Sequence, residues 1–341
     1  MDANARAFIL GCAGTELTAD ERDFISRTRP WGLILFKRNV ENREQLRRLC
    51  SQFRELTGRA DAPVLIDQEG GRVQRMGPPN WRAYPAAAKF SAAPCANEDE
   101  RLGLVRLGAR LIAEDLREAG INVDCLPVLD VPAPGGHQVI GDRAYSDDPA
   151  IVARMGQAAC EGLMQGGVLP VIKHIPGHGR AGADSHLELP RVDAPLEALR
   201  EVDFVPFQAL AAMPMAMSAH VIYTAIDSQR PATVSPTVVD RVIRGMIGYD
   251  GLVMSDDLSM KALSGSFSEK TGHLFAAGLD MALHCSGNLA ESEEVAEAAP
   301  WLEGKRAERA VRALSMIVKV PERIDSVDAS ARLDAGLAIT A

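Results

Sequence analysis

Residues 168–174 read Val-Leu-Pro-Val-Ile-Lys-His, an apolar run that ends in two ionisable side chains, Lys173 and His174. A continuous apolar run of this length is typical of a strand in a parallel sheet, because such a strand is buried on both faces. Seven similar runs occur elsewhere in the chain, at residues 8–12, 32–36, 63–67, 122–127, 215–219, 252–256 and 281–285. Segments with the amphipathic pattern of helices lie between the runs, for example residues 44–56, 100–119, 151–165 and 196–212.

The number and order of these segments predict a closed barrel. Strands that alternate with helices form a parallel sheet, and eight of them suit a (β/α)8 barrel of the TIM type better than an open sheet. No GxGxxG motif follows the first run, which weighs against a dinucleotide-binding sheet. We therefore expect an α/β fold with a single catalytic barrel over residues 1–300. A C-terminal helical extension over residues 301–341 is expected to pack on the barrel, with a helix near residues 303–318.

The composition describes a globular protein and excludes several classes of partner. Of the 341 residues, 47% are hydrophobic and 24% are charged. The net charge of −9 and the sequence pI near 5.4 argue against nucleic acid or an anionic membrane as the main partner. No apolar run approaches the ~20 residues needed to cross a bilayer. Too few residues precede Cys12 for a lipoprotein signal, so residues 7–12 are interpreted as the first strand, and the protein is expected to be a cytoplasmic monomer.

The six cysteines are spread along the chain without a CxxC pair, at positions 12, 50, 95, 125, 160 and 285. This loose spacing predicts neither a disulfide framework nor a zinc site, and it favours a reducing compartment. We accordingly expect neither a metal nor a cofactor.

Ionisable side chains gather at or just after the apolar runs, namely Asp67, Asp130, Lys173, His174, His220, Asp256 and His284. A single aspartate at such a position is most simply a helix cap or a loop residue. In a barrel of this type, however, the C-terminal ends of the strands build the active site. The repetition at six strand ends therefore favours a functional site at this end of the barrel.

The segment KHIPGHGRAGADSH at residues 173–186 is the most polar of these strand ends. Four of its fourteen residues are Pro or Gly, which predicts a mobile loop instead of a helix. Asp184 and His186, two positions apart, suit a carboxylate–imidazole pair for proton transfer. Two other interpretations stay open at this point. Asp184 caps a turn beside an exposed His186, or both residues bind a metal, although their spacing matches no HxH or HExxH motif.

This loop resembles the signature loop of glycoside hydrolase family 3, and in particular that of bacterial β-N-acetylglucosaminidases that recycle cell-wall muropeptides. The resemblance extends over nearly the whole barrel and follows the family's order. Its other parts are DQEGGRVQR at residues 67–75, IGDRAY at 140–145, SAHVIY at 218–223 and SDDLSM at 255–260.

The resemblance implies a catalytic set of three residues. The carboxylate of Asp256 is the implied nucleophile, and His186 paired with Asp184 is the implied acid and base. Strand alternation alone cannot choose between Asp256 and Asp257, because both faces of a barrel strand are buried. The family pattern selects the aspartate directly after Ser255. The implied reaction is a double displacement that retains the β-configuration.

The resemblance also implies the substrate, which is terminal β-linked N-acetylglucosamine on muropeptides, removed by an exo-acting enzyme during peptidoglycan recycling. The residues implied to surround this sugar are Asp67, Arg75, Arg143, Lys173 and His174. One carboxylate and several cationic donors suit a polyhydroxylated ligand, because ionic hydrogen bonds are stronger than neutral ones.

Three other functions compete with this one. A phosphorylase that transfers the sugar to phosphate uses the same residues, and nothing in the sequence excludes it. A metal-dependent hydrolase would carry His-x-His near the first strand, and residues 8–14 contain no histidine. A barrel that binds sugar without cleaving it would be expected to lack Asp256 or His186, and both are present.

Overall fold

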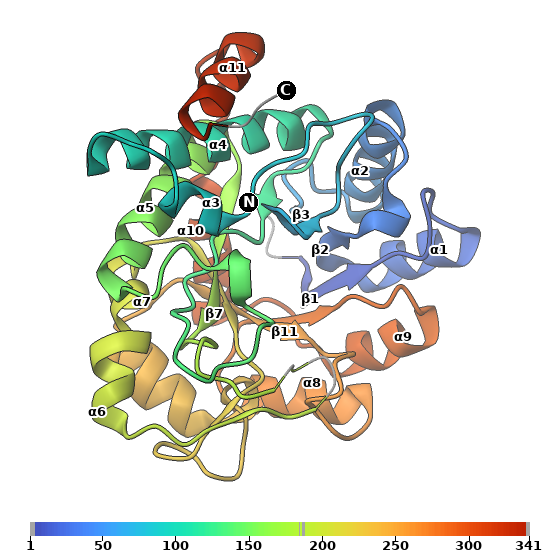
Figure 1. Ribbon diagram of the computed structural model, residues 1–341. Helices are drawn as coiled ribbons and strands as arrows, with labels where there is room; N and C mark the ends of the chain where they lie inside the picture. Colours follow the sequence, from blue (N-terminus) through green and yellow to red (C-terminus); the bar gives the residue numbers. More distant parts are fainter. Residues whose placement is uncertain (1–3, 184, 186–187, 339–341) are drawn as a thin grey trace.

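The computed structural model describes residues 4–183, 185 and 188–338. Eight parallel strands close into a barrel in the order β1-β12-β11-β9-β7-β6-β3-β2, and helices surround them (Figure 1). The strands are β1 (Arg6–Gly11), β2 (Pro30–Leu35), β3 (Val64–Ile66), β6 (Val123–Asp124), β7 (Leu169–Ile175), β9 (Met215–Ser218), β11 (Leu252–Asp257) and β12 (Met281–His284). Each predicted apolar run overlaps one of these strands. The predicted (β/α)8 barrel is therefore confirmed.

The helices follow the strands around the barrel. The α-helices are α1 (Ala19–Thr28), α2 (Arg43–Thr57), α3 (Ala87–Ser91), α4 (Glu98–Glu118), α5 (Pro149–Gln165), α6 (Leu196–Ala198), α7 (Val205–Ala209), α8 (Phe267–Ala276), α9 (Leu289–Ala298), α10 (Gly304–Ser315) and α11 (Ser326–Gly336). Short 3-10 turns cover Lys37–Asn39, Gly141–Arg143 and Ala232–Val234, and π-helical segments cover Leu199–Asp203 and Val238–Met246. Two small sheets accompany the barrel, β4 (Gln68–Gly70) with β5 (Val73–Gln74) and β8 (Arg191–Val192) with β10 (Ile222–Tyr223).

The helix expected over residues 196–212 is interrupted. It consists of α6, the π-helical segment Leu199–Asp203 and α7, which ends at Ala209. Pro206 lies at the start of α7, where its missing N–H is tolerated, whereas the interior of a continuous helix would lose a hydrogen bond there. The proline therefore explains why one amphipathic segment forms two helical pieces, the first made of α6 and the π-helical segment and the second of α7.

The barrel strands are buried on both faces, as their apolar runs predict. Ile9, Val171 and Leu283 belong to the apolar cluster that also holds the alternate residues of the other strands. Their neighbours Leu10 and Ile172 belong to the cluster formed with the surrounding helices. Because side chains fill the barrel interior, space for a ligand remains at the ends of the strands.

Two helices follow the last barrel strand and its helix. Ala310 and Ala313 of α10 pack against the inner barrel cluster, and Arg309 of the same helix donates a hydrogen bond to Asp280 over 3.0 Å. Helix α11 lies beside α4, where Leu333 is fully buried (Figure 1). The division of the chain at residue 300 stays a prediction. Across the described part of the chain, the helices lack the combination of length and apolar content that a membrane span requires.

Candidate active site

A pocket of about 290 Å³ opens at the C-terminal ends of the barrel strands. All six sequence-predicted site residues that the structure describes line it, namely Asp67, Arg75, Arg143, Lys173, His174 and Asp256. Glu69, Arg72 and Asp257 line it as well. The other two predicted residues, Asp184 and His186, lie outside the described residues. The volume is at the lower end of the range for ligand pockets and suits a small molecule.

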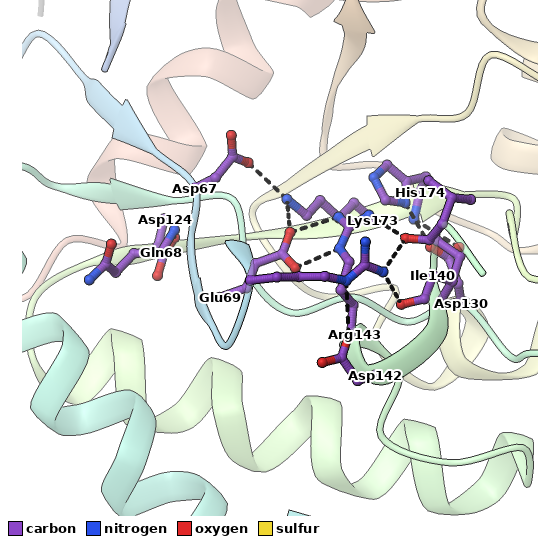
Figure 2. A network of polar contacts seen from close by, with 12 residues as sticks. Asp67, Gln68, Glu69, Asp124, Asp130, Ile140, Asp142, Arg143, Lys173 and His174 are labelled. Carbon is purple, nitrogen blue, oxygen red and sulfur yellow. Dashed lines mark hydrogen bonds and ion pairs between the residues drawn. The ribbon is translucent and has the colours of Figure 1, made fainter. Parts of the chain in front are cut away.

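The buried ammonium of Lys173, on β7, links two carboxylates of the pocket (Figure 2). Its Nζ lies 2.9 Å from Asp67 Oδ1 and 2.6 Å from Glu69 Oε1. Arg75 donates from Nη2 to the other oxygen of Asp67 over 3.0 Å. Burial would raise the pKa of Asp67, but the charges of Lys173 and Arg75 outweigh it and hold that pKa well below its usual range. Asp67 is therefore ionised, and one N–H of the ammonium remains for a ligand.

Glu69 is the main residue that the sequence interpretation missed. It accepts a bidentate pair of hydrogen bonds from Arg143, with Nε to Oε2 at 2.8 Å and Nη2 to Oε1 at 2.7 Å. Burial opposes its ionisation, yet Lys173 and Arg143 lower the pKa of Glu69 to about 2. A signal was available in the sequence, because residues two apart in extended chain point to the same side. Glu69 therefore faces the same space as Asp67.

The β4–β5 hairpin brings Arg75 back to the pocket. Gly70, with φ of +91°, allows the turn, and a Cβ at this position would lie 2.3 Å from the carbonyl oxygen of Pro85. The Gln68 side chain closes the hairpin from inside. Its Oε1 accepts the backbone N–H groups of Arg75 and Met76 at 3.0 Å each, and its Nε2 donates to the Met76 carbonyl over 2.8 Å.

His174 is held by the buried carboxylate of Asp130. Nδ1 of His174 lies 2.7 Å from Asp130 Oδ2, and Asp130 Oδ1 accepts the backbone N–H groups of His174 at 3.1 Å and His178 at 2.7 Å. Burial opposes the charge on Asp130, but His174 and these hydrogen bonds lower its pKa to about 2. An ionised carboxylate at this position requires a proton on Nδ1, so the second ring nitrogen is available for a ligand.

The two adjacent aspartates at the end of β11 have different surroundings. Asp256 accepts from the backbone N–H of Asp257 over 2.8 Å. Burial opposes its charge, yet the pKa of Asp256 is lowered by the nearby imidazoles of His174 and His220. The carboxylate of Asp257 instead accepts the backbone N–H groups of Cys285 and Ser259, each at 3.0 Å. Asp257 therefore braces two loops, whereas the Asp256 carboxylate accepts one backbone N–H, that of its neighbour Asp257.

Two other histidines of the motifs, His178 and His220, are buried and make contacts with neighbouring residues. His178 packs edge-on against His174, and its Nε2 lies 3.3 Å from the Ser185 hydroxyl. Burial, followed by the charge of His174, lowers the pKa of His178 to about 4. His220 contacts the Thr233 hydroxyl at 2.7 Å and the Asp257 carbonyl at 3.1 Å. Both rings thus position neighbouring residues.

The arrangement offers an ionised carboxylate next to a network of cationic and anionic hydrogen-bonding groups. Such a set suits nucleophilic attack on a polyhydroxylated ligand. In residues 4–183, 185 and 188–338, no three His, Cys, Asp or Glu side chains are grouped so that they could hold a metal ion.

Comparison with known proteins places this pocket in a family. The model of the glycosyl hydrolase family 3 N-terminal domain matches residues 9–316. The chain belongs to glycosyl hydrolase family 3. Its relatives include a beta-hexosaminidase of Xanthomonas oryzae pv. oryzae, which is 37% identical over 304 residues, covering 87% of each chain. A beta-hexosaminidase of Alkalilimnicola ehrlichii is 39% identical over 282 residues, or 82% of this chain and 80% of the relative.

Solved structures of family 3 share the fold. NagZ from Neisseria gonorrhoeae, in complex with N-trifluoroacetyl-D-glucosamine, superposes with a TM-score of 0.85 at 30% identity and covers 98% of both chains. A family 3 beta-N-acetylglucosaminidase from Paenibacillus sp. also gives a TM-score of 0.85, at 28% identity, over 96% of this chain and 66% of that one. The resemblance noted in the sequence is confirmed, and the protein is a glycoside hydrolase.

Proposed function

We propose that this family 3 enzyme is a retaining exo-β-N-acetylglucosaminidase, with Asp256 as nucleophile and a His186–Asp184 pair as acid and base. The relatives at 37% and 39% identity are beta-hexosaminidases, and β-N-acetylhexosaminides are the substrate class of this enzyme. The observation that carries the finer assignment is the position of Asp256 in the pocket, at the end of β11 and beside the Lys173 network, with a lowered carboxyl pKa. A glycosidase nucleophile has to be charged before it attacks.

The proposed reaction has two steps. First, a carboxylate oxygen of Asp256 attacks the anomeric carbon and the bond to the leaving oxygen breaks, while His186 donates a proton to that oxygen. Second, His186 takes a proton from water, the water oxygen attacks the same carbon, and the bond to Asp256 breaks. Two inversions restore the β-configuration. Asp184 holds the His186 ring in one tautomer and stabilises its cationic form.

The sugar hydroxyls are proposed to bind the polar network opposite Asp256. Asp67 and His174 offer an acceptor and a ring nitrogen, and Lys173, Arg75 and Arg143 offer N–H donors. Each of these groups is already held by another side chain, Lys173 by Asp67 over 2.9 Å and His174 by Asp130 over 2.7 Å. Groups fixed before binding lose little freedom when the sugar arrives, which favours affinity.

The proposed natural substrate is N-acetylglucosamine linked to anhydro-N-acetylmuramic acid peptides, cleaved in the cytoplasm during peptidoglycan recycling, without a cofactor. The family resemblance of the loop at residues 173–186 supports this choice. We further propose that residues 1–300 form the catalytic barrel, that residues 301–341 form its packed helical extension, and that the enzyme works as a monomer.

Product analysis tests the proposed function. The protein is incubated with a muropeptide that carries terminal β-N-acetylglucosamine, with and without inorganic phosphate, and the products are separated. Free N-acetylglucosamine in both reactions is expected. A sugar 1-phosphate in the phosphate reaction would instead establish the phosphorylase alternative, and cleavage of internal bonds would contradict the exo assignment.

A further inference from the structure

Glu69 pairs with two cationic side chains of the pocket, as Asp67 does, yet it is not among the residues proposed to bind the sugar. The side chain of Glu69 is 4% exposed. It accepts two hydrogen bonds from Arg143 and forms an ion pair with Lys173, with 2.6 Å between Glu69 Oε1 and Lys173 Nζ. Figure 2 shows its carboxylate between these two cations. The same carboxylate therefore orients two groups that are proposed to bind the sugar.

The acidic side chains that line the pocket equal the Arg and Lys side chains in number. Four carboxylates line it, and four cationic side chains of Arg and Lys line it as well: Asp67, Glu69, Asp256 and Asp257 against Arg72, Arg75, Arg143 and Lys173. His174 is paired with Asp130, which lies behind it. Removing the charge of Glu69 takes from Arg143 the carboxylate with which it pairs and leaves Lys173 paired with Asp67. The side chains of Arg143 and Lys173 are 11% and 2% exposed, so the added positive charge is shielded from water.

An excess charge at such a position has a specific consequence. Charges that are shielded from water interact more strongly than exposed ones, because the effective dielectric constant is lower. An arginine that has lost its carboxylate partner, next to a lysine, forms a site for oxyanions such as sulfate or phosphate. A neutral sugar gains nothing from the excess charge, so an unbalanced pocket would be occupied by anions at the expense of the sugar.

We propose that Glu69 is a positioning and specificity residue, which orients Arg143 and Lys173 and offsets their positive charge, so that the pocket accepts an uncharged terminal sugar and rejects inorganic oxyanions. This inference rests on the proposed sugar site. It assigns Glu69 no direct contact with the reacting atoms.

The test compares sulfate affinity in three variants with that of the unaltered enzyme. Glu69→Gln removes the charge, and Glu69→Asp keeps the charge but shortens the side chain. Glu161→Gln is the matched control, because Glu161 on α5 also accepts two hydrogen bonds from one arginine, Arg106, on the outside of the barrel.

Sodium sulfate is titrated against sodium chloride of equal ionic strength, which separates binding from screening. Sulfate affinity is read from competitive inhibition of aryl β-N-acetylglucosaminide hydrolysis and from the shift in melting temperature.

Glu69→Gln is expected to bind sulfate about tenfold more tightly than the unaltered enzyme, as one uncompensated charge in a shielded site would give. Glu69→Asp and Glu161→Gln are expected to keep the original sulfate affinity. Glu69→Asp should still raise KM, because Arg143 and Lys173 lose their fixed positions. Unchanged sulfate affinity in a folded Glu69→Gln protein would overturn the proposal.

A second variant decides the matter if Glu69→Gln does not fold. Arg143→Gln leaves one carboxylate in excess, so it should favour the cation glucosamine over neutral N-acetylglucosamine about tenfold more than the unaltered enzyme does. An unchanged ratio overturns the proposal. Failure of the unaltered enzyme to hydrolyse the aryl glycoside would reject the proposed function instead, and the melting-temperature measurement would still report the effect of Glu69 on sulfate binding.

Discussion

Nδ1 of His174 lies 2.7 Å from a carboxylate oxygen of Asp130, and the other oxygen of Asp130 accepts the backbone N–H groups of His174 and His178. One fully buried carboxylate therefore fixes the ring of His174 and the start of the loop that leads to the proposed acid–base residue. The direction of the His174 ring and the backbone at the start of this loop are held by the same group.

Asp130→Asn is expected to lower kcat/KM by about 10-fold to 100-fold, the equivalent of a lost ionic hydrogen bond of about 1.5–3 kcal/mol. The amide no longer accepts from Nδ1 and from both N–H groups at once, so the His174 ring turns. Asp280→Asn is the control, because Asp280 is equally buried and accepts Val253 N–H at 2.9 Å and Arg244, away from the pocket. It should lower the melting temperature but leave kcat/KM close to normal. Equal losses of activity in both variants would reject the role of Asp130.

Asp256→Asn is expected to lower hydrolysis of an aryl β-N-acetylglucosaminide by several orders of magnitude, because the amide does not attack the anomeric carbon. Asp257→Asn is the neighbouring comparison. Its carboxylate is bonded to Cys285 and Ser259, so its loss should mainly affect stability. Steady-state rates and melting curves of both variants check this prediction. A larger loss of turnover in Asp257→Asn would move the nucleophile to that residue.

His186→Ala is expected to affect substrates according to their leaving groups. A general acid typically contributes about 10²-fold to 10⁴-fold, and poor leaving groups depend on it most. The measurement is kcat/KM, which reports the first step, for a series of aryl and sugar leaving groups of increasing pKa. Rates should fall more steeply with leaving-group pKa than in the unaltered enzyme. A uniform loss across the series would argue against the acid role.

Lys173→Met is expected to destabilise the fold by about 3–5 kcal/mol, because it leaves the buried carboxylates of Asp67 and Glu69 without their shared cation. Arg106→Met removes one side of an exposed pair with Glu161 and should cost about 0–1 kcal/mol. Urea unfolding of both variants gives the two free energies. A small cost for Lys173→Met would show that the network binds the sugar without supporting the fold.

Acid should weaken the fold through Glu69 and Asp130. Both carboxyls have a pKa of about 2 in the folded protein, below the ordinary values of 4.5 and 3.8. A lowered folded pKa contributes stability that is present above the unfolded value and is lost as the pH falls towards the folded one. Melting temperature should therefore fall between about pH 4.5 and 2. The fall should be shallower in Glu69→Gln than in Glu161→Gln, and identical slopes would contradict the assignment.

The barrel was predictable from sequence because every strand is buried on both faces, so each one stands out as an apolar run between amphipathic segments. The interruption near Pro206 was not anticipated, because residues 196–212 keep a helical pattern of apolar side chains on both sides of the proline. The pattern of apolar side chains identifies which face of a segment is buried. A helix can still be interrupted by a single proline, because proline lacks the N–H that a continuous helix needs.

The site was predictable in part. Its position at the strand ends follows from the fold, and the choice of Asp256 over Asp257 came from the family resemblance. The pairing of Glu69 with Arg143 joins residues 74 positions apart in the sequence. That of Asp130 with His174 joins residues 44 positions apart. Such contacts are set by how neighbouring loops fold over the barrel, which the local sequence pattern does not contain.

The central claim is that Asp256 becomes covalently bound to the sugar. A fluorinated N-acetylglucosaminyl substrate that forms the intermediate quickly and releases it slowly is added to the enzyme, and the digested protein is then analysed by mass spectrometry. One added sugar is expected, on the peptide that contains residues 252–257 and on Asp256 within it. A sugar attached to Asp257 or to any other residue would contradict the assignment of Asp256. Turnover of the substrate without a sugar attached to any peptide would contradict the covalent intermediate.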